Sequence, residues 1–471
     1  MASDKFLECL VEDIAANARN AIVGGPFGSD LVSKDYVLSG VPVIRGANMG
    51  YGRWVSGEFV YVTNEKADSL SSNCARAGDI VFTQRGTLGQ VALIPNGTTE
   101  RYLVSQSQMK LTVDSKKADA LFLYYVFTGA EQQEYIRTNA IQTGVPHTNL
   151  GILKKTPVRL PSLNRQKSIA RILASLDDKI DLNRRINQTL EAMAQALFKS
   201  WFVDFDPVKA KIAAIQEGRD PLRAAMSAIS GKSDVELGAL LREQFGQLAA
   251  TAALFPDEME ASELGEVPKG WVIEPLSKMI QLIGGGTPKR SEPSYWQGDV
   301  LWYSVKDSPL DGDVWAVDTE ETITGLGLQN SSTKLIPVGA TIISARGTVG
   351  KLAMVGKEMA MNQSCYGVTG ANGVGSCFNY FNLKIAVEAL KRNTHGAVFD
   401  TITQATFETV TCVRPLNKQY EAFEQRVRPL LDEIRSRVIQ NRVLAALRDS
   451  LLPKLLSGEL SVAEAIAETE T

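Results

Sequence analysis

The sequence predicts an α+β protein in which two mixed α/β domains alternate with two long helices as an internal repeat. The first observation is a segment that occurs twice: Gly78–Gly89 returns as Gly339–Gly350, and both copies contain Arg-Gly-Thr-x-Gly. The second is that a long amphipathic pattern, typical of a coiled-coil-like helix, follows each domain. The separation of about 260 residues is far longer than a solenoid repeat, so the repeating unit is a whole domain with its connector. We therefore expect a protein whose two domains recognise two similar targets at a fixed separation.

The composition is that of an ordinary soluble globular protein. The 471 residues are 44% hydrophobic and 22% charged, which favours about two to four domains. No apolar run is long enough to cross a membrane, and Met1–Lys5 lacks the layout of a signal peptide. The five cysteines form no CxxC pair, which favours reduced thiols and a cytoplasmic location; they are Cys9, Cys74, Cys365, Cys377 and Cys412.

Charge and histidine content limit the function. The formal net charge of −3 argues mildly against nucleic-acid binding, but a local basic groove suffices for phosphate contact. With only His147 and His395, histidine-dependent metal or acid–base chemistry is not expected. We find no Ser/His/Asp set, no nuclease carboxylate cluster and no Asn/Asp-Pro-Pro-aromatic tetrapeptide; Asp204–Pro207 lacks the second proline and the aromatic residue. The sequence therefore predicts a chain without catalytic activity or a metal site.

Six regions are expected along the chain. Glycine-punctuated β-type runs and helical stretches fill the first globular region, with strands over Val41–Arg45, Ile80–Thr83 and Gln90–Ile94 and a helix over Ala118–Gly129. The expected boundaries are 1–163 for the first domain, 164–203 for the first long helix, 204–264 for a helical connector, 265–415 for the second domain, 416–457 for the second long helix and 458–471 for an acidic tail.

The connector and the tail are expected to be simple. An Ala-, Glu- and Lys-rich composition with breakers at Pro207, Gly218 and Pro221 predicts one or two surface helices. The segment Leu264–Trp271 predicts a loop that docks Trp271 at the start of the second domain. Beyond Gly458 we expect a frayed tail.

The two amphipathic helices carry matching positions. Aligning them places Asn187 over Asn441, Leu190 over Leu444 and Leu197 over Leu451. A buried polar residue that recurs at one level would fix the register between paired helices, so these six are the expected helix-pairing residues. Two exposed asparagines on long core helices are an equally good interpretation.

The Arg-Gly-Thr-x-Gly segments predict hairpin turns whose glycines take positive φ. A plain turn does not need the same arginine and threonine twice, and a guanidinium beside a hydroxyl suits contact with phosphate or guanine. Arg85 and Thr87, and again Arg346 and Thr348, are therefore candidate DNA contacts.

Glycine-rich and amide-rich segments accompany both turns. Gly24–Ser29 and Gly284–Arg290 match no nucleotide-binding motif, but exposed amides with Lys289 and Arg290 could cradle a phosphate. Ser105–Gln108 and Met361–Ser364 carry amides that either bond adenine edges or satisfy backbone groups, and Thr143–Asn149 is a comparable polar loop. The expected DNA-contacting residues are Ser29, Arg45, Asn48, Gln84, Arg85, Thr87, Gln106, Gln108, His147, Asn149, Thr287, Lys289, Arg290, Tyr295, Lys306, Arg346, Thr348, Asn362 and Gln363.

Taken in order, these segments resemble the specificity (S) subunit of type I restriction–modification systems over nearly the whole chain. The resemblance rests on Gly25–Ser29, the Gly-Gly-Thr-Pro segment followed by Tyr295-Trp296 and Leu301-Trp302, both Arg-Gly-Thr-x-Gly turns, Leu197–Phe205, Pro268–Trp271 and Leu451–Leu460. One departure is that Asp79 of the first copy becomes Ala340 in the second.

The resemblance implies two target-recognition domains, each reading one half of a bipartite double-stranded DNA site, and long helices that lie antiparallel and hold the domains apart. Two methyltransferase (M) subunits would dock on the helices and carry S-adenosylmethionine and the N6-adenine chemistry. Two restriction/translocase (R) subunits could add ATP- and Mg²⁺-dependent cleavage, and this chain would hold no cofactor. A helix of about 37 residues is roughly 55 Å long, which equals the length of on the order of 16 base pairs of DNA.

Other readings stay open at this point. A self-sufficient nuclease or methyltransferase would need the catalytic motifs that are missing. A protein-binding scaffold with two paired domains fits the acidic pI, and the chain could also serve another multi-subunit methyltransferase system. The duplicated arginine turns and the amide clusters favour DNA.

Overall fold

The fold was analysed on a computed structural model that describes residues 6–50, 52–97, 99–142, 146–263, 265–393 and 401–470. The chain forms two compact units, which we describe separately. Unit 1 comprises Met1–Asp181 with Asn441–Thr471, and unit 2 comprises Leu182–Gln440. The boundary between the units cuts both long helices, so each unit contains one half of each helix.

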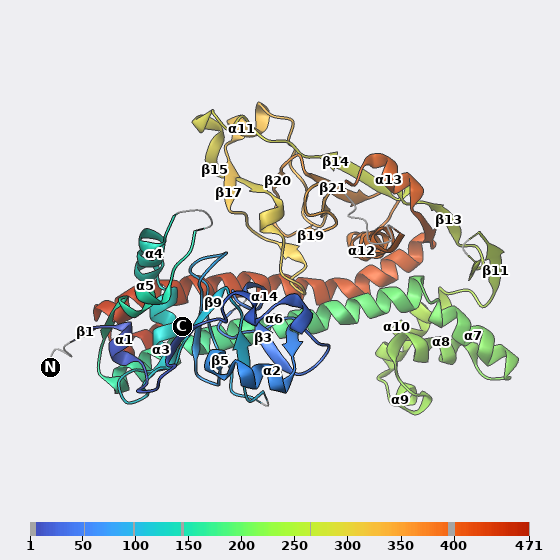
Figure 1. Ribbon diagram of the computed structural model, residues 1–471. Helices are drawn as coiled ribbons and strands as arrows, with labels where there is room; N and C mark the ends of the chain where they lie inside the picture. The colour runs from blue at the N-terminus through green and yellow to red at the C-terminus, as the bar shows by residue number, and fades with distance from the viewer. Residues whose placement is uncertain are drawn as a thin grey trace. The chain divides into compact units, whose positions relative to one another are not determined.

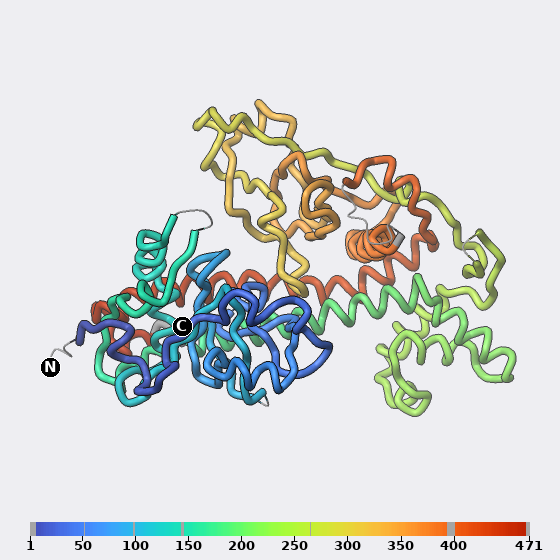
Figure 2. The backbone as a smooth tube through the Cα atoms, viewed as in Figure 1, coloured from blue at the N-terminus to red at the C-terminus, as the bar shows by residue number. Residues whose placement is uncertain are grey.

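The two predicted long helices are present and antiparallel. Helix α6 runs over Leu163–Phe202 and α14 over Asn417–Ser457, and the tube in Figure 2 shows them side by side. In unit 2, Asn183 donates from Nδ2 to Oε1 of Gln440 at 2.8 Å, while the ring of Phe198 lies 5.7 Å from that of Phe423. Positions later in α6 therefore contact positions earlier in α14.

The core of unit 1 contains two four-stranded sheets. The first has the order β2-β9-β6-β7 and is antiparallel throughout. The second has the order β4-β3-β8-β5, in which β3 and β8 are parallel. Their strands are β2 (Ile22–Gly24), β3 (Val41–Ile44), β4 (Val60–Val62), β5 (Cys74–Ala75), β6 (Ile80–Thr83), β7 (Val91–Leu93), β8 (Tyr102–Val104) and β9 (Gln108–Leu111).

Unit 2 has a related pair of sheets, several of whose strands are labelled in Figure 1. Its sheets have the orders β14-β21-β18-β19-β16 and β17-β15-β20, and the pair β15–β20 is parallel like β3–β8. The unit differs from unit 1 in an added strand, β16, which pairs parallel with β19, and in a three-stranded second sheet, where β20 forms the edge among the described residues. The repeat of sequence is therefore accompanied by a repeat of strand order and direction in the rest of the two sheets. The strands are β14 (Ile280–Gly284), β15 (Trp296–Tyr303), β16 (Trp315–Ala316), β17 (Glu321–Ile323), β18 (Thr341–Ser344), β19 (Leu352–Val355), β20 (Ala360–Met361) and β21 (Cys365–Gly370).

Shorter elements complete the two units in corresponding ways. In each, an antiparallel pair brings the domain's start beside the strand that precedes a long helix: β1 with β10, and β13 with β22. The bounds are β1 (Leu7–Leu10), α1 (Val11–Ile14), α2 (Asn64–Ser69), α3 (Ala120–Thr128), α4 (Ala130–Asn139), α5 (Leu150–Lys154), β10 (Pro157–Leu160), β13 (Val272–Pro275), α11 (Gly325–Gln329), α12 (Ser376–Asn393), α13 (Gln404–Thr409) and β22 (Thr411–Arg414).

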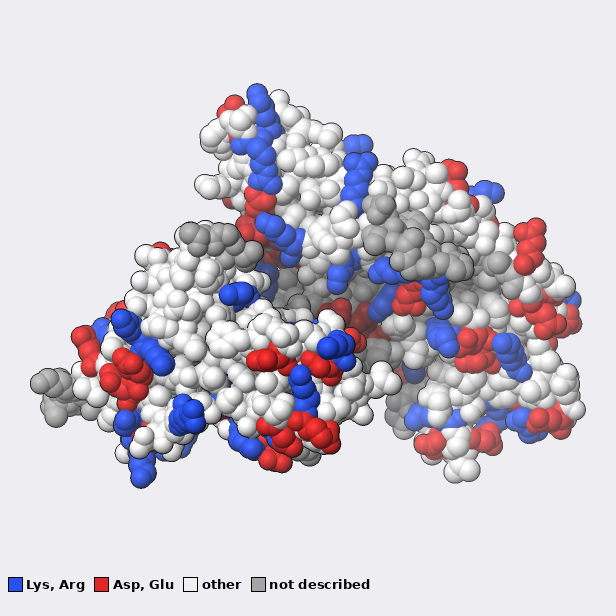
Figure 3. All heavy atoms as spheres, in the orientation of Figure 1, with Lys and Arg blue, Asp and Glu red and all other residues white. Residues whose placement is uncertain are grey.

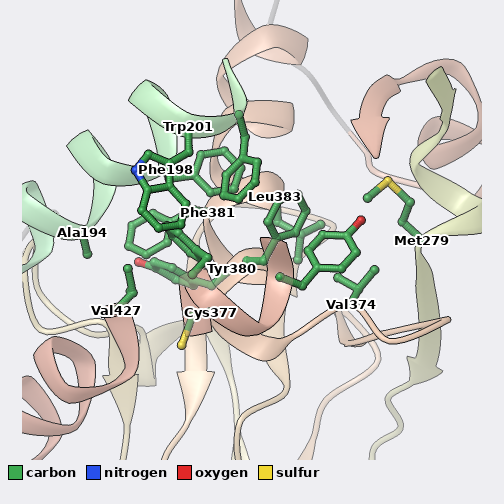
Figure 4. Close-up of a cluster of buried hydrophobic side chains, with 14 of the residues drawn as sticks. Ala194, Phe198, Trp201, Met279, Val374, Cys377, Tyr380, Phe381, Leu383 and Val427 are labelled. Carbon is green, nitrogen blue, oxygen red and sulfur yellow. The ribbon is translucent and has the colours of Figure 1, made fainter. Parts of the chain in front are cut away.

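An aromatic cluster joins the long helices of unit 2 to α12 (Figure 4). The Phe198 ring, 2% exposed, lies 5.1 Å from Phe378 and 5.9 Å from Phe381. Trp201 is fully buried in the same cluster. Ring pairs at such separations stabilise beyond their buried area, so this cluster fixes α12 against the helix pair.

The connector is more structured than expected. Instead of one or two surface helices it contains four: α7 (Asp206–Gln216), α8 (Pro221–Ser230), α9 (Asp234–Gly238) and α10 (Arg242–Ala253). The predicted breakers Pro207 and Pro221 stand in the first turns of α7 and α8, where proline is tolerated because its missing N–H has no helical partner.

Two further expectations are corrected. The segment before Trp271 is a hairpin of β11 (Met259–Ser262) and β12 (Gly265–Pro268) rather than a loop, with Leu264 outside the described residues; Trp271 itself is 4% exposed, as expected. The tail is not frayed but forms α15 (Val462–Glu470). Ser461 and Glu464 cap its first turn by mutual hydrogen bonds, and Ala465 is fully buried in the core of unit 1.

The structure explains the exchange of Asp79 for Ala340. Asp79 is buried and forms an ion pair with Lys110 at 3.3 Å, and it also accepts a hydrogen bond from Thr112. In the registers of the two sheets, the position of Lys110 in unit 1 corresponds to Gly367 in unit 2. Both members of the pair are thus replaced together, which leaves no unpaired buried charge.

None of the helices in the described ranges is both long and apolar enough to cross a membrane.

Candidate nucleic-acid interface

Each Arg-Gly-Thr-x-Gly segment is a hairpin turn at one end of a buried strand. In unit 1 it joins β6 to β7, and Gly86 and Gly89 have φ values of 100° and 87°. Side-chain-bearing residues adopt this region rarely, which explains the glycines. Arg85 and Thr87 are exposed on this turn, and no ion pair or hydrogen bond engages the Arg85 guanidinium within the described ranges.

The turn in unit 2 has the same form. It joins β18 to β19, with φ values of 75° at Gly347 and 80° at Gly350. The Ser344 hydroxyl donates to the carbonyl of Thr348 at 2.5 Å and accepts from the Lys351 amide at 2.8 Å, which braces the turn from inside. Arg346 is exposed, and its guanidinium too has no partner among the residues that the structure describes.

The glycine-rich segments pack directly against the amide-rich ones. A Cβ at Gly25 would overlap the carbonyl oxygen of Ser105, and a Cβ at Gly285 would overlap that of Asn362. Backbone hydrogen bonds reinforce the approach in unit 1, where the Gly25 amide donates to Gln108 at 2.9 Å. Glycine is needed here because two backbones come together.

Four segments therefore converge in each unit. In unit 1 the Gln84 amide donates to the carbonyl of Ser107 at 2.7 Å, and the Thr148 amide donates to that of Gln84 at 3.0 Å. In unit 2 the amides of Ala345 and Ile402 make the matching bonds to Ser364 and Ala345, at 2.7 and 2.9 Å. We call these groups loop cluster 1 (24–29, 84–89, 105–108 and 146–149) and loop cluster 2 (284–290, 345–350, 362–364 and 401–402). Residues 143–145 of the predicted polar loop lie outside the described residues.

Several predicted DNA contacts are instead structural. Asn48 is fully buried and donates to the carbonyls of Ser56 and Glu58 at 3.1 and 2.9 Å, so it cannot face a base. Gln108 is fully buried in β9 and accepts from the Ser105 hydroxyl. Asn149 caps α5 by accepting from the Ile152 amide at 2.9 Å. Each of these amides bonds nearby protein groups. For Gln108 the open alternative was a bond to backbone groups, whereas its partner is the Ser105 side-chain hydroxyl.

In unit 2 the Arg290 guanidinium also has internal partners. It forms an ion pair with Glu321 and lies 3.9 Å from the ring centroid of Trp296. The bond to Glu321 raises the pKa of Arg290, although burial opposes the rise. Thr287 donates its hydroxyl proton to Gln363. Asn362 accepts from the Ser364 amide at 3.0 Å, and Tyr295 is half-buried. Arg290 therefore stabilises its loop rather than standing free for a phosphate.

The remaining predicted contacts are accessible to different degrees. Gln106 is exposed but its amide already donates to the carbonyl of Gly28 at 2.6 Å. Half-buried residues are Arg45, Gln84 and His147. Exposed ones, besides those of the turns, are Ser29, Lys289, Lys306 and Gln363. The accessible residues of clusters 1 and 2 thus include one unpaired arginine each.

The helix-pairing residues are only partly where the repeat alignment suggested. Asn187 is fully buried, but it donates to Asp313 at 2.9 Å rather than to α14, and burial raises the pKa of Asp313. The asparagine that bonds across the helix pair in unit 2 is Asn183, which also accepts from Arg437 at 3.0 Å. Its place among the leucines of the stripe was the signal. Leu190 and Leu197 pack on the core of unit 2, Leu444 and Leu451 on that of unit 1, and Asn441 is half-buried.

Sequence reasoning missed the groups that attach each domain to the helices. In unit 1, Arg53 pairs with Asp178 at 2.5 Å, and the Tyr125 hydroxyl donates to Asp177 at 2.7 Å. Burial and the Asp177 carboxylate raise the pKa of Tyr125, so it stays a hydrogen-bond donor. In unit 2, Lys384 pairs with Glu191 at 2.7 Å. Within the described residues, no three or more His, Cys, Asp or Glu side chains are arranged to hold a metal ion.

The geometry defines a class of protein: two units of related topology built on shared antiparallel helices, each presenting a cluster of polar loops. Comparisons with known proteins give the family. Residues 40–192 and 268–423 match the family described as the type I restriction modification DNA specificity domain. The chain belongs to this family of type I restriction–modification specificity subunits.

Individual relatives agree along almost the whole chain. The type I restriction enzyme HindI specificity subunit of Haemophilus influenzae is 32% identical over 91% of this chain and 97% of its own. The MjaIX specificity subunit of Methanocaldococcus jannaschii is 24% identical over 86% and 85%. A solved S subunit from M. genitalium is 14% identical, covers 97% of both chains and has a TM-score of 0.49.

Proposed function

We propose that this chain is the DNA-recognition subunit of a type I restriction–modification complex, in which each unit reads one half of a bipartite site. The observation that carries this proposal is the duplication of the loop cluster. Each cluster is braced by backbone bonds and presents one exposed arginine without an internal partner, Arg85 or Arg346. A guanidinium on a fixed turn is suited to a phosphate or to the O6 and N7 of guanine.

Local charge is compatible with this role despite the net charge of −3. On the face shown in Figure 3, Lys and Arg side chains occur on both units among Asp and Glu side chains. Phosphate contact needs a few well-placed cations rather than a basic chain, because affinity depends on the phosphates neutralised. Loop cluster 2 contains two exposed cations that could serve this purpose, Lys289 and Arg346.

The long helices would set the spacing between half-sites and dock two methyltransferase subunits. Apolar side chains left exposed on them support docking: in unit 2, Met193 of α6 is 50% exposed and Ile439 of α14 is 46% exposed. The methyltransferase subunits would hold S-adenosylmethionine and modify adenine N6. Restriction subunits, where present, would hold ATP and Mg²⁺. This chain would recognise the DNA sequence and would catalyse no reaction.

The test of the function is a genome-wide map of N6-methyladenine in the source cell, with and without this chain. We expect one split motif, two short blocks around a fixed unspecified gap, to lose methylation when the chain is absent. An unchanged map together with no sequence preference of the purified chain and its methyltransferase partner on random DNA would refute the proposal.

Replacing either turn arginine by alanine should weaken DNA binding. For Arg85→Ala and Arg346→Ala we expect about 5- to 100-fold lower affinity each, the range for a lost base or phosphate contact. The measurement is a binding titration of the complex at several salt concentrations. If the contact is to phosphate, the salt slope falls by about one. The control is Arg219→Ala, an exposed arginine at the end of α7 that pairs with Glu217. Wild-type affinity in both variants at moderate salt would remove these residues from the interface.

A further inference from the structure

One aromatic side chain in loop cluster 1 is exposed in a way that the fold does not explain. Phe27 is 85% exposed, and it is the only aromatic residue in the exposed class among those the structure describes. A phenylalanine ring is normally buried, because exposing apolar surface to water raises the free energy of the folded state. The exposed ring is therefore available to a partner outside the chain.

The loop that carries Phe27 is braced by contacts on both sides of this residue. Gly25 lies against the Ser105 backbone, and Pro26 is buried. After Phe27, Gly28 has a φ of 52°, and the Gln106 side-chain amide donates to the carbonyls of Gly28 and Leu31 at 2.6 and 3.1 Å. The Asp30 amide closes the turn onto the carbonyl of Phe27 at 3.0 Å. These contacts thus fix the backbone from which the ring projects into solvent.

Unit 2 has a different residue at the same place. The equivalent contacts of Gly25 on Ser105 and of Gly285 on Asn362 align Phe27 with Thr287 and Gln106 with Gln363. Both glutamines fasten their loop, but Gln363 does so by accepting the hydroxyl proton of Thr287, which is half-buried. The two clusters share their frame and differ at this position between an exposed ring and an engaged hydroxyl.

We propose that Phe27 is a specificity-determining residue that contacts a base, through its ring, in the half-site bound by unit 1. The inference rests on the proposed function. Phenylalanine contacts bases apolarly, for example at the thymine methyl group, and such contacts distinguish one base from another. Because Thr287 has no ring, is half-buried and has its hydroxyl engaged by Gln363, unit 2 presents a different surface at this position, and the two units read different half-sites with similar loops.

The surroundings favour DNA over a protein partner. The residues that follow Phe27 in the turn, Gly28, Ser29 and Asp30, are exposed and offer no apolar side chain. A protein interface would bury a contiguous apolar patch around such an anchor. A single ring held among polar loops, in the same cluster as the unpaired Arg85, fits a groove lined with phosphates and base edges.

The experiment compares Phe27→Ala and Phe27→Thr, which installs the residue of unit 2, with the matched control Val235→Ala, an 84% exposed apolar residue on α9. The full chain, assembled with its methyltransferase partner, selects from a duplex library in which each half-site is randomised in turn. We expect both Phe27 variants to lose about tenfold of the preference at one or two adjacent positions of one half-site only. The other half-site and the control should be unchanged.

Unchanged preference at every position of both half-sites would overturn the inference. So would failure of the Phe27 variants, but not of Val235→Ala, to assemble with the methyltransferase partner, because the ring would then be a protein contact. If the wild-type complex itself selects no split site, the proposed function fails instead. These outcomes separate the two proposals.

Discussion

The substitution Gly25→Val should lower the affinity of the complex for its DNA site by at least about 100-fold. This loss is the one expected when most of the contacts to one half-site are removed. The cause is steric. A side chain at Gly25 overlaps the backbone carbonyl of Ser105, and backbone cannot swing away as a flexible side chain can. Displacing Ser105 also moves Ser107, whose carbonyl accepts hydrogen bonds from the backbone amides of Gln84 and Arg85. The arginine turn and the glycine-rich loop then lose their common position.

Gly285→Val should act in the same way on the other half-site, through the carbonyl of Asn362. The control is Gly97→Val, because a Cβ at Gly97 meets no atom within 4 Å and its φ is not positive. The measurement is selection from the two half-randomised libraries, with a thermal melt of each variant to show that the units remain folded. Wild-type reading of both half-sites by Gly25→Val and Gly285→Val would contradict the loop-cluster interpretation.

Local features of the fold were accessible from the sequence. The strand predicted over Ile80–Thr83 has those bounds in β6, and the long helix predicted over 164–203 is α6, Leu163–Phe202. The strand follows from a short apolar run and the helix from apolar periodicity, both of which the chain carries without tertiary information. The internal repeat extended this to unit 2, because a repeated sequence predicts a repeated topology.

Side-chain roles in the candidate site were less accessible. Asn48 and Gln108 have the same chemistry as an adenine-reading amide, yet both are buried and hold neighbouring protein groups. Whether an amide faces solvent depends on how loops far apart in the chain converge, which no local pattern encodes. The turns themselves were more accessible, because their glycines indicated positive φ, and both turn arginines are exposed; their contact with DNA stays a prediction.

The asparagines of α6 show the same limit within a helix. Asn183 and Asn187 are four residues apart and therefore lie on one face. A polar residue on the apolar face of a helix indicates a buried hydrogen bond, but the rotation of the helix decides its partner. Asn183 reaches Gln440 of α14, whereas Asn187 reaches Asp313 in a loop of the domain. One asparagine thus joins the helix pair and the other joins α6 to the recognition domain of unit 2.

Stability should depend most on the aromatic cluster of unit 2. For Phe198→Ala we expect the free energy of unfolding to fall by about 3–5 kcal/mol, because truncation of a buried phenylalanine leaves a cavity. The ring contacts those of Phe202, Phe378 and Phe423 at 5.4, 5.1 and 5.7 Å, so α6, α12 and α14 all lose packing. The loss corresponds to a melting temperature of unit 2 lower by roughly 6–20 °C.

The matched control is Met193→Ala on the same helix. The Met193 side chain is 50% exposed, and its truncation should change the free energy of unfolding by less than about 0.5 kcal/mol. Urea unfolding followed by tryptophan fluorescence measures both, since Trp201 and Trp271 lie in the cluster. Equal losses for the two variants would mean that the helix pair, rather than the ring cluster, holds unit 2 together. A loss confined to Phe198→Ala places the attachment of the second recognition domain in the rings that α6, α12 and α14 share.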